Sequence, residues 1–198
     1  MLVIGLAVLS TIPLPILPLQ ILYLNLVTDV FPAFALAMGE GDSGILNRPP
    51  RDPKEAILGR SQWVTVVLHS LAMSAGTFGA LAAARLWLDL DARGAVTVTF
   101  LTLAFAQLWQ VFNMRHPRAG VARNEITRNP WVWASLLLCT VLLVAPPYVA
   151  PIAHVLHLAA VTPLMWGIII GLSVAPLLAT QAVMRMLVLW RTPISVHA

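Results

Sequence analysis

Long apolar stretches dominate the sequence, and short polar segments separate them. Five of these stretches cover residues 16–38, 61–88, 95–114, 131–149 and 163–190. An α-helix needs about 20 mostly apolar residues to cross the hydrocarbon core of a bilayer, and each stretch has about that length or more. The pattern therefore predicts five membrane-spanning helices.

A further apolar run at residues 1–11 is too short to span a bilayer. Pro13, Pro15 and Pro18 follow it and interrupt a helix at this point. The run also lacks the basic leader of a secretory signal peptide, so we interpret it as the remnant of a preceding helix. The predicted fold over residues 1–198 is an all-α, polytopic membrane helix bundle of this partial helix and five transmembrane helices.

The composition is typical of a membrane protein. Hydrophobic residues make up 59% of the 198 residues and charged residues 10%, whereas soluble domains contain about 25% charged residues. Mean hydropathy is +0.85. The net charge of +4 does not indicate a nucleic-acid partner, because the basic residues lie between apolar runs instead of forming one face. We expect the lipid bilayer to surround the chain.

The basic residues also predict an orientation. Ten of the twelve lie at alternate ends of the predicted helices: Arg48, Arg51, Lys54, Arg60, Arg115, Arg118, Arg123, Arg128, Arg185 and Arg191. The positive-inside rule places these ends, and with them the C-terminus, in the cytoplasm. The abundance of Ala, Leu, Val and Arg points to a GC-rich bacterial genome, so we expect an integral protein of a bacterial plasma membrane.

Asp29 is the one acidic residue deep inside a predicted span. A charge at this depth costs several kcal/mol and is therefore a functional candidate. Asn25, Thr28 and Asp29 share one helical face and offer hard oxygen ligands for Ca²⁺, Mn²⁺, Mg²⁺ or a proton. Pro32 follows, and a helix broken there would free carbonyls for a cation. Alternatively, a protonated Asp29 hydrogen-bonds a neighbouring helix.

A second polar set lies on the span at 95–114. Gln107, Gln110 and Asn113 either complete a cation shell or form hydrogen bonds between helices. His154 and His157 have a spacing that can bind a metal, but no third ligand is nearby in the sequence, and we interpret them as interfacial histidines.

Two further features of the spans favour packing over chemistry. The span at 61–88 is rich in small residues, and pairs such as Gly76 and Ala80 suit a close approach of helices. The single cysteine, Cys139, lies in an apolar run, where we expect it to be inert.

Two motifs resemble a known family. The sequence PLQILYLNLVTD at residues 18–29 resembles the sixth transmembrane helix of P-type cation ATPases of the calcium-pump type. The sequence NRPPRDPKE at residues 47–55 resembles the cytoplasmic loop that follows it in these pumps. The remaining helices agree with the family in number, loop length and orientation. Essentially all 198 residues are thus similar to the C-terminal transmembrane region of such a pump.

The resemblance implies roles for named residues. Asn25, Thr28 and Asp29 match the cation ligands of the family's sixth helix. Gln107 falls where calcium pumps with two cation sites have a glutamate on the eighth helix, so it is a weaker ligand and favours a single cation per cycle. The loop Arg48–Glu55 resembles the segment that contacts the phosphorylation domain. Ca²⁺ is the expected ion, with Mn²⁺, Mg²⁺ and H⁺ left open.

The catalytic parts of the family do not occur in this sequence. The Asp-Lys-Thr-Gly-Thr motif, the nucleotide-binding and actuator domains and the fourth helix are missing, and the acidic ligand of the fifth helix would fall before Met1. By the resemblance, ATP and Mg²⁺ serve only the complete pump. We therefore expect a C-terminal fragment without catalytic residues or cofactor, whose partner is the N-terminal catalytic part. Two alternatives are a non-catalytic scaffold or assembly partner of a split pump, and an inactive truncated relic.

Overall fold

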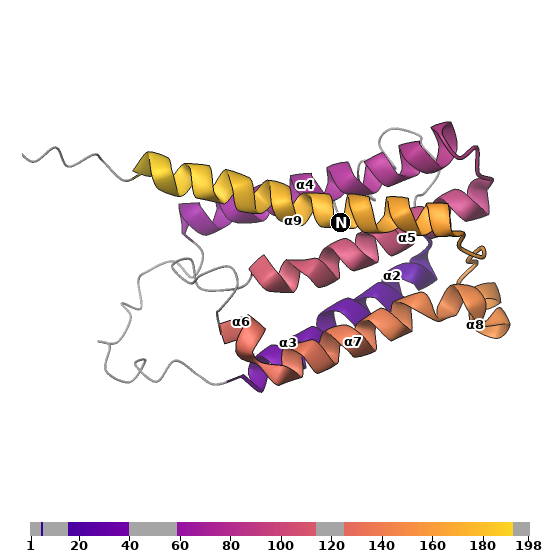
Figure 1. Ribbon diagram of the computed structural model, residues 1–198, viewed down its shortest axis with the longest axis horizontal. Helices are drawn as coiled ribbons and strands as arrows, with labels where there is room; N and C mark the ends of the chain where they lie inside the picture. Colours follow the sequence, from indigo (N-terminus) through magenta and orange to yellow (C-terminus); the bar gives the residue numbers. More distant parts are fainter. Residues whose placement is uncertain (1–4, 6–15, 40–58, 114–124, 192–198) are drawn as a thin grey trace, which may run out of the picture.

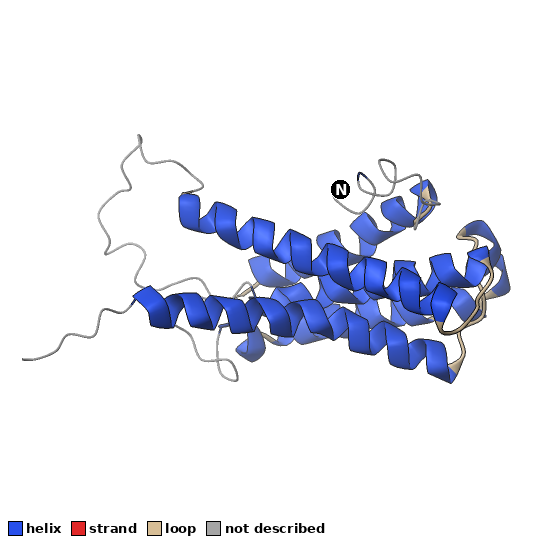
Figure 2. Ribbon diagram, turned by 90° about the horizontal axis from the view of Figure 1, so that it is seen from above, coloured by secondary structure: helices blue, strands red, loops and turns tan. Residues whose placement is uncertain are grey.

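The computed structural model describes residues 5, 16–39, 59–113 and 125–191, and the regular structure in these ranges is entirely helical (Figure 2). The long helices are α4 (Arg60–Leu86), α5 (Ala92–Trp109), α7 (Pro130–Val144) and α9 (Pro163–Arg191). One continuous helical segment near the N-terminus consists of α2 (Pro18–Leu24), the π-helix η1 (Asn25–Val30) and α3 (Phe31–Ala37). Short elements are η3 (Gln110–Asn113), α6 (Glu125–Arg128), η4 (Pro146–Tyr148) and α8 (Ala150–Val155).

Five helical segments of the described residues are long and apolar enough to cross a membrane. They are Pro18–Ala37, Gln62–Leu86, Ala92–Asn113, Pro130–Tyr148 and Pro163–Val183. This confirms the predicted all-α membrane bundle with five spans. The predicted remnant at residues 1–11, apart from Gly5, and the motif at residues 47–55 lie outside the described residues.

Polar caps fix where two of the spans begin. The Asp91 carboxylate accepts a hydrogen bond from the backbone N–H of Gly94 at 2.8 Å and caps α5. The Asn129 side chain accepts one from the N–H of Trp131 at 2.9 Å and caps α7, whose first residue is Pro130. Both caps satisfy N–H groups that a helix N-terminus leaves without a partner. Helix α5 therefore starts directly after its cap. Its first residues precede the apolar run at 95–114 from which the span is predicted.

Helix α5 lies at the centre of the bundle (Figure 1). Helices α4 and α9 pack against each other and against α5 on one side, and the first span and α7 pack together on the other. In the most apolar window of α5, 72% of the residues are buried, against 22% to 39% in the other four spans. Because α5 contacts both sides, the position of its side chains links the two parts of the bundle.

A small residue permits the close approach of α4 and α9. Gly76 of α4 lies against Pro176, which stands inside α9. A Cβ atom at position 76 would lie 2.9 Å from Cγ of Pro176 and 3.0 Å from the carbonyl oxygen of Leu172. These distances are shorter than van der Waals contact, so the packing of α4 on α9 depends on glycine at this position.

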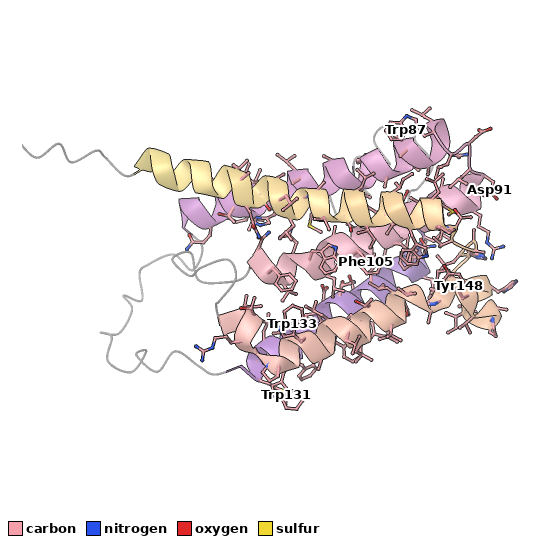
Figure 3. All side chains as sticks on the ribbon, viewed as in Figure 1. Trp87, Asp91, Phe105, Trp131, Trp133 and Tyr148 are labelled. Carbon is pink, nitrogen blue, oxygen red and sulfur yellow. The ribbon has the colours of Figure 1, made fainter. Side chains whose placement is uncertain are left out.

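Aromatic residues mark both ends of the bundle (Figure 3). Trp131 and Trp133 lie at the end where α7 begins, whereas Trp87 and Tyr148 lie at the opposite end, together with Asp91. Tryptophan and tyrosine prefer the interfaces of a bilayer, because one part of each ring system is apolar and another forms hydrogen bonds. Aromatic side chains at both ends are the arrangement expected of a bundle that crosses a membrane lengthwise.

Candidate cation site in the first span

The predicted ligands Asn25, Thr28 and Asp29 all lie in the π-helix η1. The span is not broken at Pro32, as the sequence suggested; it continues through this proline into α3, and the turn before it is widened. The helix accommodates a π turn by including one extra residue in that turn, so the helix does not have to end there. Such turns are rare within α-helices and occur frequently at functional sites.

The structure brings Thr28 and Gln107 together, although 79 positions separate them in the sequence. The Thr28 side chain is 6% exposed, and its hydroxyl oxygen lies 2.7 Å from Oε1 of Gln107 on α5. The same hydroxyl lies 2.9 Å from the carbonyl oxygen of Leu24, one turn earlier. Since the hydroxyl carries one proton, it donates to one of these acceptors at a time.

Asn25 and Asp29 are exposed, unlike Thr28. The nearer carboxylate oxygen of Asp29 is 3.5 Å from the Thr28 hydroxyl, which is a weak contact. Leu22 and Leu26 on the same span are also exposed, at 66% and 54%. The site therefore has one side that is packed against α5 and one side that is open and surrounded by apolar residues.

The second polar set does not act as one group. Gln110 and Asn113 lie in the 3₁₀ turn η3, and Asn113 forms hydrogen bonds with α4 and α9. The Asn113 side-chain nitrogen is 2.7 Å from Oε1 of Gln110, 3.2 Å from the Thr180 hydroxyl and 3.3 Å from Nε2 of His69, and Gln181 donates to the Asn113 carbonyl oxygen at 3.1 Å. Gln107 alone of this set reaches the first span.

Helix α7 holds the first span through contacts that the sequence does not reveal. Asn129 donates to the carbonyl oxygen of Ala35 at 2.9 Å, and the Cys139 thiol donates to that of Val27 at 3.1 Å. In the reverse direction, the Tyr23 hydroxyl donates to the Leu142 carbonyl. The sequence does not reveal this role of Cys139, because a cysteine that only packs and a cysteine that donates a hydrogen bond occur in the same kind of apolar run.

The side chains available as metal ligands are of the types that bind a hard cation. In the part of the chain that the structure describes, no group of three or more His, Cys, Asp or Glu side chains lies together. His154 and His157 are both exposed, with ring centres 6.4 Å apart. The first span instead offers carboxylate, amide and hydroxyl oxygens, the ligand types that Ca²⁺ and Mg²⁺ take.

Comparisons with known proteins agree with these observations. Residues 13–186 match the family described as "Cation transporting ATPase, C-terminus". The chain is 34% identical over 170 residues to the "Calcium-transporting ATPase" of Bacillus subtilis (strain 168), an alignment that covers 86% of this chain and 19% of that protein. It is 28% identical over 183 residues to "Calcium-transporting ATPase 1" of Bacillus cereus (strain ATCC 10987 / NRS 248), with 85% and 21% covered. The chain thus spans about a fifth of the length of these relatives.

Proposed function

Because the chain belongs to the cation-transporting ATPase family, as its C-terminal region, we propose that it is the membrane module of an ATP-driven pump for a divalent cation, foremost Ca²⁺. Both relatives are named for calcium transport. In this proposal the module contributes part of the ion site within the bilayer. Hydrolysis of ATP, with Mg²⁺, belongs to regions of the complete pump that this chain does not match.

The observation that carries the proposal is the contact of Thr28 with Gln107 beside Asp29. We assign the charge of the site to the Asp29 carboxylate and neutral oxygens to Asn25 and Thr28. We assign two roles to Gln107: it supplies a neutral oxygen, and it holds Thr28 against α5. One carboxylate balances half the charge of a divalent ion, so the site needs further ligands.

The open side of the site is where those further ligands would approach. Asn25 and Asp29 are exposed there, in a span whose other exposed residues are apolar. A charge in such a position is stabilised by a bound cation or by polar groups of neighbouring helices. We propose that other helices of the complete pump cover this side, and that movement of the phosphorylated pump then weakens the site and releases the ion.

We also propose the orientation that the basic residues predict. The end where α3 finishes and α4 begins would face the cytoplasm of a bacterium, and the end with Trp87 and Tyr148 would face outward. Labelling of single cysteines introduced beyond α9, in whole cells and in opened cells, tests this directly. Reaction in opened cells alone is the expected result.

Titration calorimetry of the purified chain with CaCl₂ tests the site itself. We expect weak binding, with a Kd on the order of 0.1–1 mM, because few charged ligands are present. Asp29→Asn should abolish this heat of binding. Asp89→Asn is the matched control: Asp89 lies between α4 and α5 with a φ of 46°, which asparagine also adopts.

The control defines what each outcome means. Loss of binding in Asp29→Asn with normal binding in Asp89→Asn supports the proposed site. Equal calcium binding by the chain and by Asp29→Asn would contradict it, because the ion would then bind elsewhere. Circular dichroism of each variant establishes that its helices are intact.

A further inference from the structure

The backbone of η1 contains a carbonyl group that lacks its helical donor. A π turn pairs each carbonyl with the N–H group five residues further on. For Val27 that residue is Pro32, which has no N–H group. Val27 as a whole residue is 1% exposed, so its carbonyl has little access to water. A buried carbonyl without a donor is destabilising, because it has lost its hydrogen bond to water and gained none in return.

The Cys139 thiol supplies the missing proton. Its sulfur lies 3.1 Å from the Val27 carbonyl oxygen, across 112 positions of sequence, and the cysteine is 0% exposed. Ser135, one turn earlier on α7, has its hydroxyl oxygen 4.0 Å from the same sulfur. A thiol is a weak donor, so it satisfies the carbonyl without holding the turn as firmly as a hydroxyl would.

The two neighbouring helices thus hold the same turn from different directions. Helix α7 binds the carbonyl of Val27 through Cys139, and α5 binds the side chain of the next residue, Thr28, through Gln107. Asp29 follows directly and is exposed. A rotation of the Val27 peptide would turn Thr28 away from α5 and move Asp29 with it, since successive residues share their backbone planes.

We propose that Cys139 is a positioning residue of the cation site. Its thiol satisfies the carbonyl that Pro32 leaves without a donor, and thereby sets the turn that carries Thr28 and Asp29. This inference rests on the proposed function, because it assigns Cys139 a role in the site that Asp29 forms. It differs from a packing role, which any buried apolar side chain of similar size would fill.

Infrared spectroscopy of the S–H stretch observes this contact directly. The chain has one cysteine, so the purified protein gives a single S–H band without any mutation. We expect the band below the position of a free thiol, and a further shift when CaCl₂ is added. Asp29→Asn should keep the first position and lose the calcium-induced shift. A band at the free-thiol position, or one that calcium leaves in place while it binds, would overturn the inference.

Calcium affinity of three variants separates positioning from packing. Cys139→Ala removes the donor and should weaken calcium binding about three- to tenfold, the equivalent of one hydrogen bond. Cys139→Ser retains a donor and should stay within about twofold of the unmodified chain. Leu143→Ala is the packing control, because Leu143 is 0% exposed on the same helix and loses more apolar volume.

The outcomes distinguish this inference from the proposed function. Weaker binding in Cys139→Ala, with rescue by serine and normal affinity in Leu143→Ala, supports the positioning role. Equal affinity in Cys139→Ala, or an equal loss in Leu143→Ala, overturns it while Asp29-dependent binding remains. Absence of Asp29-dependent binding in the unmodified chain overturns the proposed site, and the positioning role falls with it.

Discussion

The bundle has polar side chains in two places, and the two differ in what surrounds them. Between α4, α5 and α9, the polar groups of His69, Asn113 and Gln181 face one another across helix boundaries. In the first span, Thr28 faces α5, but Asn25 and Asp29 are exposed among apolar residues. Similar side chains therefore have different surroundings: the first group joins helices, whereas the second has oxygen atoms without a partner in the described part of the bundle.

The difference shows why burial of polar groups is informative in a membrane helix. A polar cluster enclosed by three helices has its partners within the bundle and needs no ligand. Within the described residues, Gln110 Nε2 is the buried side-chain nitrogen or oxygen that lacks a partner, so the cluster is satisfied except at this one atom. The joining of helices does not explain an exposed carboxylate such as that of Asp29, because lipid offers it neither hydrogen bonds nor an opposite charge.

The largest expected effect comes from the open side of the site. We expect a chimera, in which this chain replaces the matching region of the Bacillus subtilis relative, to take up calcium into inverted membrane vesicles when ATP is added. Asp29→Asn in the chimera should lower this uptake at least about tenfold, because it removes the charge of the site. Asp89→Asn should leave the uptake unchanged.

The chimera also separates the proposed pump module from the other interpretations of the sequence. A chimera that reaches the membrane in normal amounts but takes up no calcium would favour a relic. Uptake that Asp29→Asn does not alter would favour a scaffold that contributes no ligand.

A smaller effect is expected where the enclosed group of helices is packed most closely. Gly76→Ala should lower the free energy of unfolding by about 1–3 kcal/mol, because the added methyl group meets Pro176 and the Leu172 carbonyl. Thermal unfolding in detergent, followed by circular dichroism, measures the change. Gly79→Ala is the matched control on the same helix, since a Cβ atom there meets nothing within 4 Å. An equal loss in both variants would contradict the close-packing argument.

The smallest effect is expected in the polar cluster. Asn113→Leu keeps the side-chain volume but leaves Gln181 and Gln110 without this partner. Hydrogen bonds between membrane helices contribute about 0.6 kcal/mol on average, so we expect a loss of about 0.6–2 kcal/mol in unfolding free energy. Calcium binding by the chain should not change. A loss of calcium binding comparable to that of Asp29→Asn would place Asn113 in the ion site. The polar cluster and the first span would then not differ in function.

The sequence is sufficient to predict the fold, and the family resemblance it shows is confirmed by the comparisons. Spans are predictable because their length and apolar character are local properties. The start of α5 is less so, because Asp91, its cap, precedes the apolar run by several residues. Caps and turns depend on single polar side chains, which an apolar window averages out.

The site was only partly predictable. Local spacing places Asn25, Thr28 and Asp29 together, but it assumes an α-helix and gives no warning of a π turn. The family resemblance names Gln107 as a candidate, but its contact with Thr28 comes from 79 positions away and only the packing of the helices reveals it. The contact of Cys139 with this turn spans 112 positions, and nothing in the sequence predicts it. Gln110 begins the 3₁₀ turn η3 and contacts Asn113, whereas Gln107 contacts the first span.

The two acceptors of the Thr28 hydroxyl have a consequence for how the first span can move. While the hydroxyl donates to Gln107, the span is joined to α5, and through α5 to α4 and α9. If the span withdraws, the same proton turns to the Leu24 carbonyl, which belongs to the moving helix itself. The Thr28 hydroxyl then still has an acceptor, so the loss on breaking the contact falls on Gln107 alone. Thr28 thus has the chemistry of a reversible latch between the first span and α5.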